Sequence, residues 1–240
     1  MRWIEAGAAL GLLAGIGQAP GPLQHPPQAP PPVLPAPVQP PLQPRYVVVL
    51  DAAHGGADSG AKLGAGVLEK DITLGLAGRL RSMLRARGID VVLTRQADMA
   101  MAPLDRAQTA NHAQAAACLV LHATATGSGV HLFTSSLAPA ARMQFLPWQT
   151  AQAAYVTQSL KLESEIDTAL AHAQIQVTLA RASVEPMDSL ACPEVAVEVA
   201  PLVAGQVSAG KPITDGGYQT SVVDAIVAAL EAWRSDWKAS

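Results

Sequence analysis

Charged and aromatic residues are scarce in this chain of 240 residues: Asp, Glu, Lys and Arg make up 15% of it, and Phe, Trp and Tyr only 4%. The 16 Lys and Arg are outnumbered by 19 Asp and Glu, which gives a formal net charge of -3. A strongly basic surface is therefore not expected, and no nucleic-acid partner is predicted. Because hydrophobic residues make up 50% of the chain, burial of apolar surface can offset the entropy lost on folding, which argues against a disordered chain.

Cysteine is also scarce. The chain has two, Cys118 and Cys192, and both stand at the start of apolar runs. The favoured interpretation is two buried thiols that pack as small hydrophobic groups. A disulfide between them is the alternative if the chain is exported, since disulfides persist in oxidising compartments.

Long apolar segments are missing beyond the N-terminus, so no later segment is a candidate for crossing a membrane. Residues 1–19 have Arg2 near their start, an apolar run over residues 6–16 and small residues near Ala19. This layout is typical of a secretory signal peptide. An uncleaved membrane anchor and a buried helix are the alternatives, and the favoured interpretation predicts export.

Proline is concentrated in one segment. Residues 20–44 hold 12 of the 19 prolines, a density that excludes a helix or an interior strand. We interpret this segment as a polyproline-type linker, with a tail that has no task as the alternative. Residues 45–240 then form the folding unit, a single domain by its size.

The folding unit alternates strand-like and helix-like segments. Strands are expected near residues 46–50, 89–95, 118–125, 129–136 and 193–202, and helices near residues 69–87, 104–116, 148–172 and 220–237. The alternation predicts an α/β fold, with a mostly parallel twisted sheet and helices on both faces in a single catalytic domain. The strand at 129–136 is expected at the sheet edge or in a hairpin with the strand before it, and residues 177–182 are ambiguous.

Four residues can bind a metal or act as an acid or base. They lie near the carboxyl ends of strands, where functional sites of open α/β sheets are usually found. His54 follows the first predicted strand, His122 lies near the end of the third, Glu198 lies in the last, and Glu69 begins the first helix. Two imidazoles and one carboxylate form a three-ligand set for a catalytic Zn²⁺. A further carboxylate could accept a proton from a metal-bound water and donate a proton to the leaving group. The four residues therefore predict a hydrolase.

Each of these residues also has a simpler explanation. A histidine after a strand is commonly a hydrogen-bonded loop residue, and a glutamate such as Glu69 at a helix start interacts favourably with the helix dipole. Glu198 is the unusual one, because it lies among valines of an apolar strand and would be costly to bury without a partner. It either faces solvent or is compensated by a cationic group.

Six separated blocks of the chain resemble, in order and spacing, the zinc-dependent N-acetylmuramoyl-L-alanine amidases that cleave bacterial cell walls. The blocks are DAAHGGADSGA, LEKDITL, VVLTRQAD, LDRAQTANHAQA, LHATA and CPEVAVEVAPL. The resemblance covers residues 46–204, and six matching blocks in one order make it specific.

The resemblance implies that His54, Glu69 and His122 hold one Zn²⁺ and that Glu198 is the catalytic glutamate. The implied reaction hydrolyses the amide bond between N-acetylmuramic acid and L-alanine of peptidoglycan stem peptides. Peptidoglycan or a muropeptide is then the substrate, in the periplasm or cell envelope. The resemblance leaves room for a protein activator, and no substrate-binding residue is assigned.

Five positions depart from the pattern of that family. Glycine, serine and asparagine are usual where this chain has Ala53, Val120 and Thr124, and glycine with an aromatic residue is usual at Ala200 and Pro201. None of these changes removes a metal ligand, but they lie where they can affect substrate positioning. The alternative function is therefore a catalytically impaired peptidoglycan-binding or regulatory module with the same fold. A third candidate is an amidase acting on another amide or peptide.

Other polar and aromatic residues receive structural interpretations. Arg106 is expected to pair with a carboxylate such as Asp98 beneath the cleft, and Lys70 is expected on the surface of a first helical turn. Trp148 is assigned to the core, with the edge of a glycan groove as the alternative. His131, on a predicted strand, is placed at the rim of the cleft.

Overall fold

The computed structural model describes residue 21 and residues 45–64, 66–140, 145–204 and 210–237. The predicted signal segment at 1–19 and, apart from residue 21, the predicted linker at 20–44 lie outside these ranges, so both stay predictions. Within the described ranges, no helix has the length and apolar character needed to cross a membrane.

Six strands form one sheet in the order β2-β1-β3-β6-β4-β5. They are β1 (Val47–Ala52), β2 (Asp90–Leu93), β3 (Ala117–Ala123), β4 (Val130–Ser135), β5 (Val177–Ala182) and β6 (Glu194–Val199). Strands β2, β1, β3 and β6 are parallel, whereas β4 runs antiparallel to β6 and β5 runs parallel to β4. The predicted mostly parallel sheet is confirmed.

The placement predicted for β4 is wrong. This strand pairs with β6 and β5 and so lies inside the sheet, neither at an edge nor in a hairpin with β3. The ambiguous residues 177–182 form β5, which is the edge strand beside β4. The hydrophobic pattern of a strand indicates which of its faces are buried, but it does not indicate which strands lie next to it.

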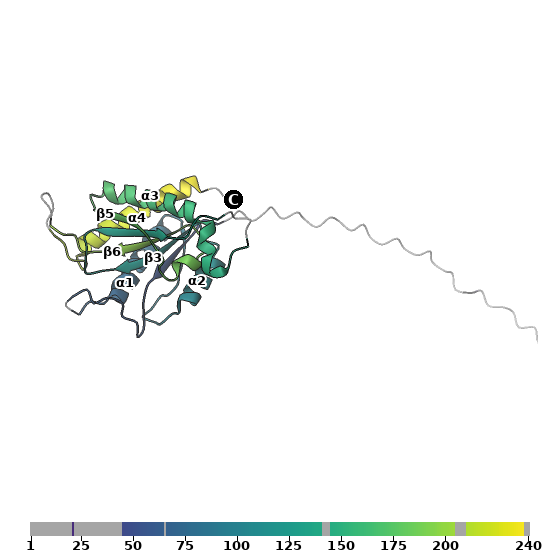
Figure 1. Ribbon diagram of the computed structural model, residues 1–240, viewed down its shortest axis with the longest axis horizontal. Helices are drawn as coiled ribbons and strands as arrows, with labels where there is room; N and C mark the ends of the chain where they lie inside the picture. Colours follow the sequence, from purple (N-terminus) through teal and green to yellow (C-terminus); the bar gives the residue numbers. More distant parts are fainter. Residues whose placement is uncertain (1–20, 22–44, 65, 141–144, 205–209, 238–240) are drawn as a thin grey trace, which may run out of the picture. The chain divides into compact units, whose positions relative to one another are not determined.

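Helices cover both faces of the sheet, as predicted. One face packs against α1 (Glu69–Ala86), α3 (Val156–His172) and α4 (Gly216–Asp236), and Figure 1 shows α3 and α4 side by side. The other face carries α2 (Pro103–His112) and the short 3₁₀ helix η2 (Met187–Ser189).

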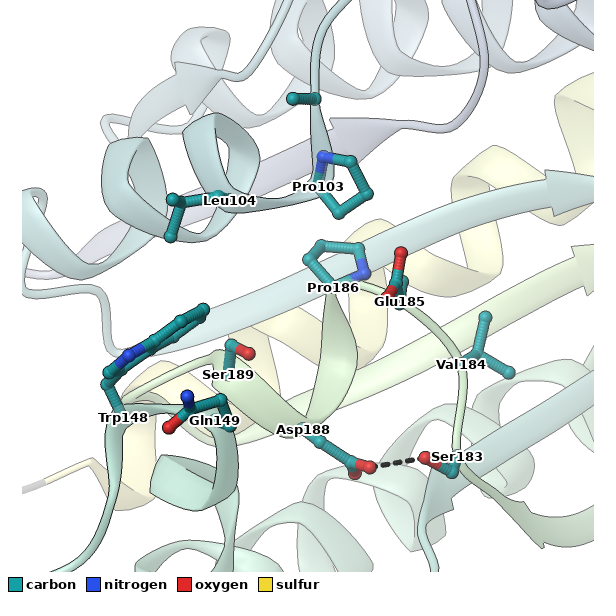
Figure 2. A pocket seen from close by; sticks show the side chains of 11 residues that line it. Pro103, Leu104, Trp148, Gln149, Ser183, Val184, Glu185, Pro186, Asp188 and Ser189 are labelled. Carbon is teal, nitrogen blue, oxygen red and sulfur yellow. Dashed lines mark hydrogen bonds between the residues drawn. The ribbon is translucent and has the colours of Figure 1, made fainter.

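The segment expected as one helix over 148–172 is two elements, the 3₁₀ helix η1 (Trp148–Ala154) followed by α3. The core position expected for Trp148 is wrong, because the residue is 54% exposed. It borders a cavity of about 440 Å³ together with Leu104 and Pro186 (Figure 2).

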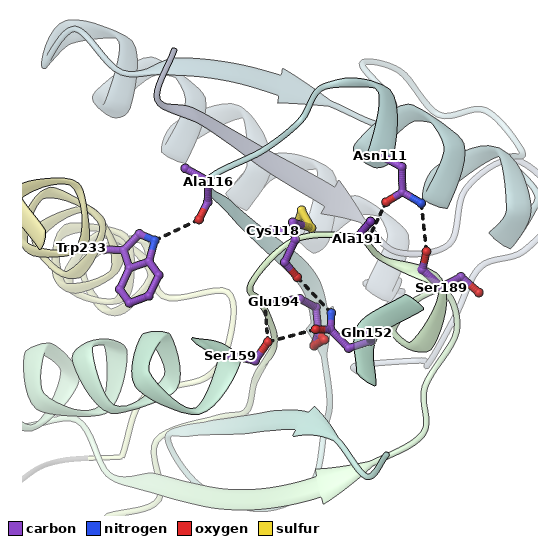
Figure 3. The surroundings of a disulfide bond; sticks show 10 residues. Asn111, Ala116, Cys118, Gln152, Ser159, Ser189, Ala191, Glu194 and Trp233 are labelled. Carbon is purple, nitrogen blue, oxygen red and sulfur yellow. Dashed lines mark hydrogen bonds between the residues drawn. A yellow bond between two sulfur atoms is a disulfide. The ribbon is translucent and has the colours of Figure 1, made fainter. Parts of the chain in front are cut away.

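The two cysteines form a disulfide, so the favoured prediction of free thiols is wrong. Cys118 lies in β3, and Cys192 lies just before β6, the strand that pairs with β3. This pairing brings their Cα atoms to 6.1 Å, a separation that suits a disulfide. Both cysteines belong to the apolar cluster on the sheet face that carries η2, and Figure 3 shows the surroundings of the bond.

Glu194 is the most deeply buried carboxyl group among the described residues with a shifted pKa, and neither of its side-chain oxygens has a hydrogen-bond partner. Its backbone N–H donates to Ser159 Oγ, and Ser159 in turn donates to Gln152 (Figure 3). Burial raises the pKa of the Glu194 carboxyl well above its usual range, and the nearby Asp188 and Glu163 raise it further. Folding therefore favours the neutral form of this carboxyl.

Removing the disulfide with the double substitution Cys118→Ala and Cys192→Ala is expected to destabilise the protein. For the sequence separation of 74 residues, the lost loop constraint is worth about 4 kcal/mol. Urea unfolding of the variant and of the wild type, each with and without reductant, measures the loss. Two free thiols in the non-reduced wild type would contradict the disulfide.

Replacing Glu194 with Gln is expected to flatten the pH dependence of stability. A raised pKa in the folded state means that the carboxyl contributes its full stability below its unfolded pKa, and that this contribution is lost as the pH rises toward the folded pKa. Above the ordinary pKa of a glutamate, the free energy of unfolding of the wild type should therefore fall more steeply with rising pH than that of Glu194→Gln, by at most about 1.4 kcal/mol per pH unit for one proton. The exposed Glu185→Gln serves as the control in urea unfolding, and equal slopes for wild type and Glu194→Gln would refute the explanation.

Candidate metal centre

His54 stands on the loop that follows β1, in a left-handed backbone conformation with φ of 63°. Its carbonyl oxygen accepts a hydrogen bond of 2.6 Å from Arg106, a contact that helps to hold this conformation. The ring Nδ1 lies 2.8 Å from Asp58 Oδ2, which leaves Nε2 directed at Glu69, 3.1 Å from Oε2. A carboxylate on one ring nitrogen is the arrangement that orients a metal-binding histidine.

Glu69 begins α1 and is buried between the two histidines. Its Oε2 accepts from the N–H of Ala61 at 2.8 Å, and its Oε1 accepts from the N–H of Ala123 at 3.1 Å. Burial alone would raise the pKa of this carboxyl, but the hydrogen bonds from His122, Ala61 and Ala123 outweigh burial and lower the pKa to about 2. Glu69 is therefore a carboxylate throughout the physiological pH range.

His122 lies in β3, and its Nδ1 is 2.8 Å from Glu69 Oε1. The rings of His54 and His122 meet edge to face with centroids 5.5 Å apart. One ligand atom from each of the three residues falls within 4.8 Å of the others, and among the described residues this is the one such group of three. The structure thus brings together the residues that the sequence selected as metal ligands.

The separations inside this group suit a small tetrahedral ion. Zinc bonds of about 2.0–2.2 Å in tetrahedral geometry place two ligand atoms roughly 3.3–3.6 Å apart. The distances of 3.1 Å from His54 Nε2 to Glu69 Oε2 and of 2.8 Å from His122 Nδ1 to Glu69 Oε1 are slightly shorter. Two imidazoles and an ionised carboxylate are donors that zinc accepts, so the residues fit this metal.

Glu198 lies on β6 directly beside His122 in the strand register, and on its other side stands His131 of β4. Its side chain is 29% exposed, and Oε2 lies 2.7 Å from His131 Nδ1. The two alternatives that the sequence posed for this glutamate both apply in part, since it reaches solvent and also has a partner that can carry positive charge.

A protein-family model described as N-acetylmuramoyl-L-alanine amidase matches residues 48–232, most of the chain. The chain belongs to this family. The resemblance seen in the sequence blocks is thereby confirmed.

Curated relatives of the amidase family match part of the chain. N-acetylmuramoyl-L-alanine amidase AmiA of Escherichia coli (strain K12) is 37% identical over 106 residues, which are 42% of this chain and 37% of AmiA. An endolysin of Bacillus phage SPP1 is 43% identical over 84 residues, which are 35% of this chain and 31% of the endolysin. The matches thus span about a third of the length of these relatives.

Solved amidase structures share the fold over nearly their whole length. The catalytic domain of CwlV from Bacillus (Paenibacillus) polymyxa var. colistinus aligns with a TM-score of 0.61 and 22% identity, over 79% of this chain and 98% of that one. Ami1 from Mycobacterium smegmatis aligns with a TM-score of 0.63 and 19% identity, over 80% of this chain and 98% of that one. These likenesses support the α/β architecture of the amidase domain.

The expectation that Arg106 pairs with a carboxylate is confirmed with a different partner, whereas the surface position expected for Lys70 is wrong. Arg106 pairs with Asp51 at 2.8 Å instead of Asp98, because Asp51 is buried in β1 under the guanidinium. Asp98 accepts from Lys70 at 2.7 Å and from the N–H of Gly56 at 2.7 Å. Lys70 is thus not a free surface residue of this amidase-family domain, since only 13% of its side chain is exposed.

Arg95 is a supporting residue to which sequence reasoning gave no role. Its guanidinium donates to the carbonyl oxygens of Ala52 at 2.8 Å, Ala53 at 3.0 Å and Lys70 at 2.7 Å. It therefore joins the end of β1, which leads to His54, to the helix turn that begins at Glu69. The one signal in the sequence was its place in a matching amidase block, VVLTRQAD.

Gly60 allows the loop after β1 to pass close to two of the metal-ligand candidates. It has a φ of +61°, and a Cβ at this position would fall 2.6 Å from Glu69 Oε2 and 2.6 Å from His54 Cδ2. These distances are too short for carbon contacts, so only glycine fits here without displacing a ligand side chain.

The substitution Gly60→Ala is expected to weaken Zn²⁺ binding tenfold or more, by about the amount that disturbing the support of a metal ligand costs. Gly66→Ala is the matched control, because Gly66 lies in the same loop with a φ of +79° and an added Cβ meets nothing within 4 Å. Competition against a zinc chelator measures both affinities. Equal affinities for the two variants would contradict the role given to Gly60.

Proposed function

We propose that this chain is a zinc-dependent amidase that hydrolyses the amide bond between N-acetylmuramic acid and L-alanine in peptidoglycan stem peptides. The observation that carries the proposal is the convergence of His54, Glu69 and His122 within 4.8 Å, beside Glu198. Membership of the amidase family over residues 48–232 supports the same reaction.

Three side chains would hold the metal and a fourth would move the protons. Zn²⁺ held by His54, Glu69 and His122 would polarise the scissile carbonyl and would allow a water to ionise near neutral pH. Asp58 orients the His54 ring, and the N–H groups of Ala61 and Ala123 hold the Glu69 carboxylate in place.

Glu198 acts as the general base and then as the general acid. It accepts a proton from the attacking water and later delivers that proton to the nitrogen of the leaving L-alanine. Its register position beside His122 and its exposure to solvent support this role, since a proton acceptor must reach both the metal side of the cleft and the substrate. Oε2 contacts His131, which leaves Oε1 for the proton transfer.

The proposal places the protein outside the cytoplasm, in the periplasm or cell envelope, where peptidoglycan lies. The disulfide between Cys118 and Cys192 supports export, because structural disulfides persist in oxidising compartments. The predicted signal segment at 1–19 agrees with this location, and the linker at 20–44 would let the domain reach a wall substrate.

Incubation of the full chain with purified peptidoglycan, with and without a zinc chelator, tests the function. The expected products are free stem peptides with an N-terminal L-alanine, identified by mass spectrometry and lost on chelation. Stoichiometric zinc without release of stem peptides would favour the alternative of an impaired binding or regulatory module. Cleavage of a different amide or peptide bond would favour the third candidate, an amidase that acts on another amide or peptide.

The substitution Glu198→Gln is expected to lower the rate by about 10² to 10⁴, the usual contribution of a general acid–base. Zinc content should stay at the wild-type level, because Glu198 is not among the three converging ligands. Glu165→Gln, on helix α3 at the opposite face of the sheet, is the control for the loss of one carboxylate. Hydrolysis by Glu198→Gln at the wild-type rate would show that another group moves the proton.

A further inference from the structure

We infer that His131 is a positioning residue for hydrolysis, which holds the Glu198 carboxylate in the orientation that proton transfer requires. The inference rests on the proposed function, since it assigns a task to a neighbour of the proposed acid–base. His131 lies on β4, which runs antiparallel to β6, and it contacts neither of the other two histidines of the cleft through any hydrogen bond among the described residues.

The sheet itself sets the relation between the two side chains. Glu198 pairs in register with His122 on β3 and with His131 on β4, so the three residues form one row across the sheet. Residues directly opposite each other on neighbouring strands point to the same face, with Cβ atoms about 4.5–5.5 Å apart. Glu198 therefore stands between a metal-ligand candidate and a second imidazole.

The imidazole of His131 is held firmly in its position. Only 17% of the side chain is exposed, and the loop after β3 passes over the ring at Gly127. A Cβ at Gly127, which has a φ of +84°, would fall 2.4 Å from His131 Cε1 and 2.6 Å from Nε2. The glycine thus lets the loop cover the ring, which restricts the rotamers open to it.

The contact of 2.7 Å has the length of a charge-assisted hydrogen bond, with His131 Nδ1–H donating to Glu198 Oε2. A free glutamate on a partly exposed strand would lose rotamer entropy each time it adopted one working orientation. With Oε2 held, Oε1 has a fixed direction in which to accept a proton. The donor on Oε2 remains in place while Oε1 carries the proton, so the carboxyl group need not rotate between the two transfers.

The substitutions at this position are chosen to separate donation from ring packing. His131→Asn keeps an N–H donor close to the place of Nδ1, whereas His131→Phe keeps a ring and removes the donor. His172→Phe is the matched control, because His172 is an exposed residue in the last turn of α3. The three variants and the wild type are compared as full chains for kcat and KM on a muropeptide and for zinc content.

His131→Phe is expected to lower kcat by about 10- to 100-fold, as a small misplacement of a reacting group does. KM and zinc content should stay within about twofold of the wild type, and His131→Asn should recover most of kcat. His172→Phe should match the wild type. A His131→Phe variant with unchanged kcat, or a His131→Asn variant as impaired as His131→Phe, would overturn the inference.

Nitrogen-15 NMR of the histidine rings tests the hydrogen bond without turnover. In the wild type, the His131 ring is expected to carry its proton on Nδ1, and Glu198→Ala should shift that signal. No shift would overturn the inference even where His131→Phe fails to fold. A wild type that releases no stem peptide overturns the proposed function and this inference together, whereas an active wild type with an unchanged His131→Phe overturns this inference alone.

Discussion

Two buried guanidinium groups, of Arg95 and Arg106, hold the end of β1, and the positions of His54 and Glu69 depend on them. Together they donate to the carbonyl oxygens of three successive residues, Ala52, Ala53 and His54, at 2.6–3.0 Å. Ala52 is the last residue of β1, and Ala53 and His54 follow it, so these carbonyls lie where the strand ends. An unsatisfied buried carbonyl costs about 1–3 kcal/mol. Planar guanidinium donors can serve several carbonyls at once, which a lysine could not do in one plane.

The row formed by His122, Glu198 and His131 depends on strand pairing and not on buried cations. His122, Glu198 and His131 come from β3, β6 and β4, and their alignment follows from the register alone. A slip of one residue in β6 would turn Glu198 to the opposite face, which is packed with valine and leucine. The buried valines at alternate positions of β6 therefore help to fix the face of the sheet to which the glutamate points.

The sequence predicted local features well and long-range neighbours poorly. The helix predicted over residues 69–87 is confirmed, because its apolar spacing lies in one segment of the chain. Residue type and the family resemblance select His54, Glu69 and His122, and the structure brings these three residues together. The disulfide is only the alternative prediction, and Asp51 is not predicted as the partner of Arg106, because each contact joins segments that are far apart in the sequence. The order β3-β6-β4 places sequence segments about 70 residues apart in contact, and hydrophobic pattern carries no record of that order.

The two glutamates of β6 show how position along one strand decides chemistry. Glu194 and Glu198 are four residues apart, so they point to the same face of the sheet. At the start of the strand, Glu194 is enclosed, has no partner for its side-chain oxygens and is held neutral by burial. At the end of the strand, Glu198 reaches solvent, and its Oε2 contacts the imidazole of His131. The carboxyl ends of the parallel strands are thus the place in this sheet where a carboxylate can be both fixed and available for reaction.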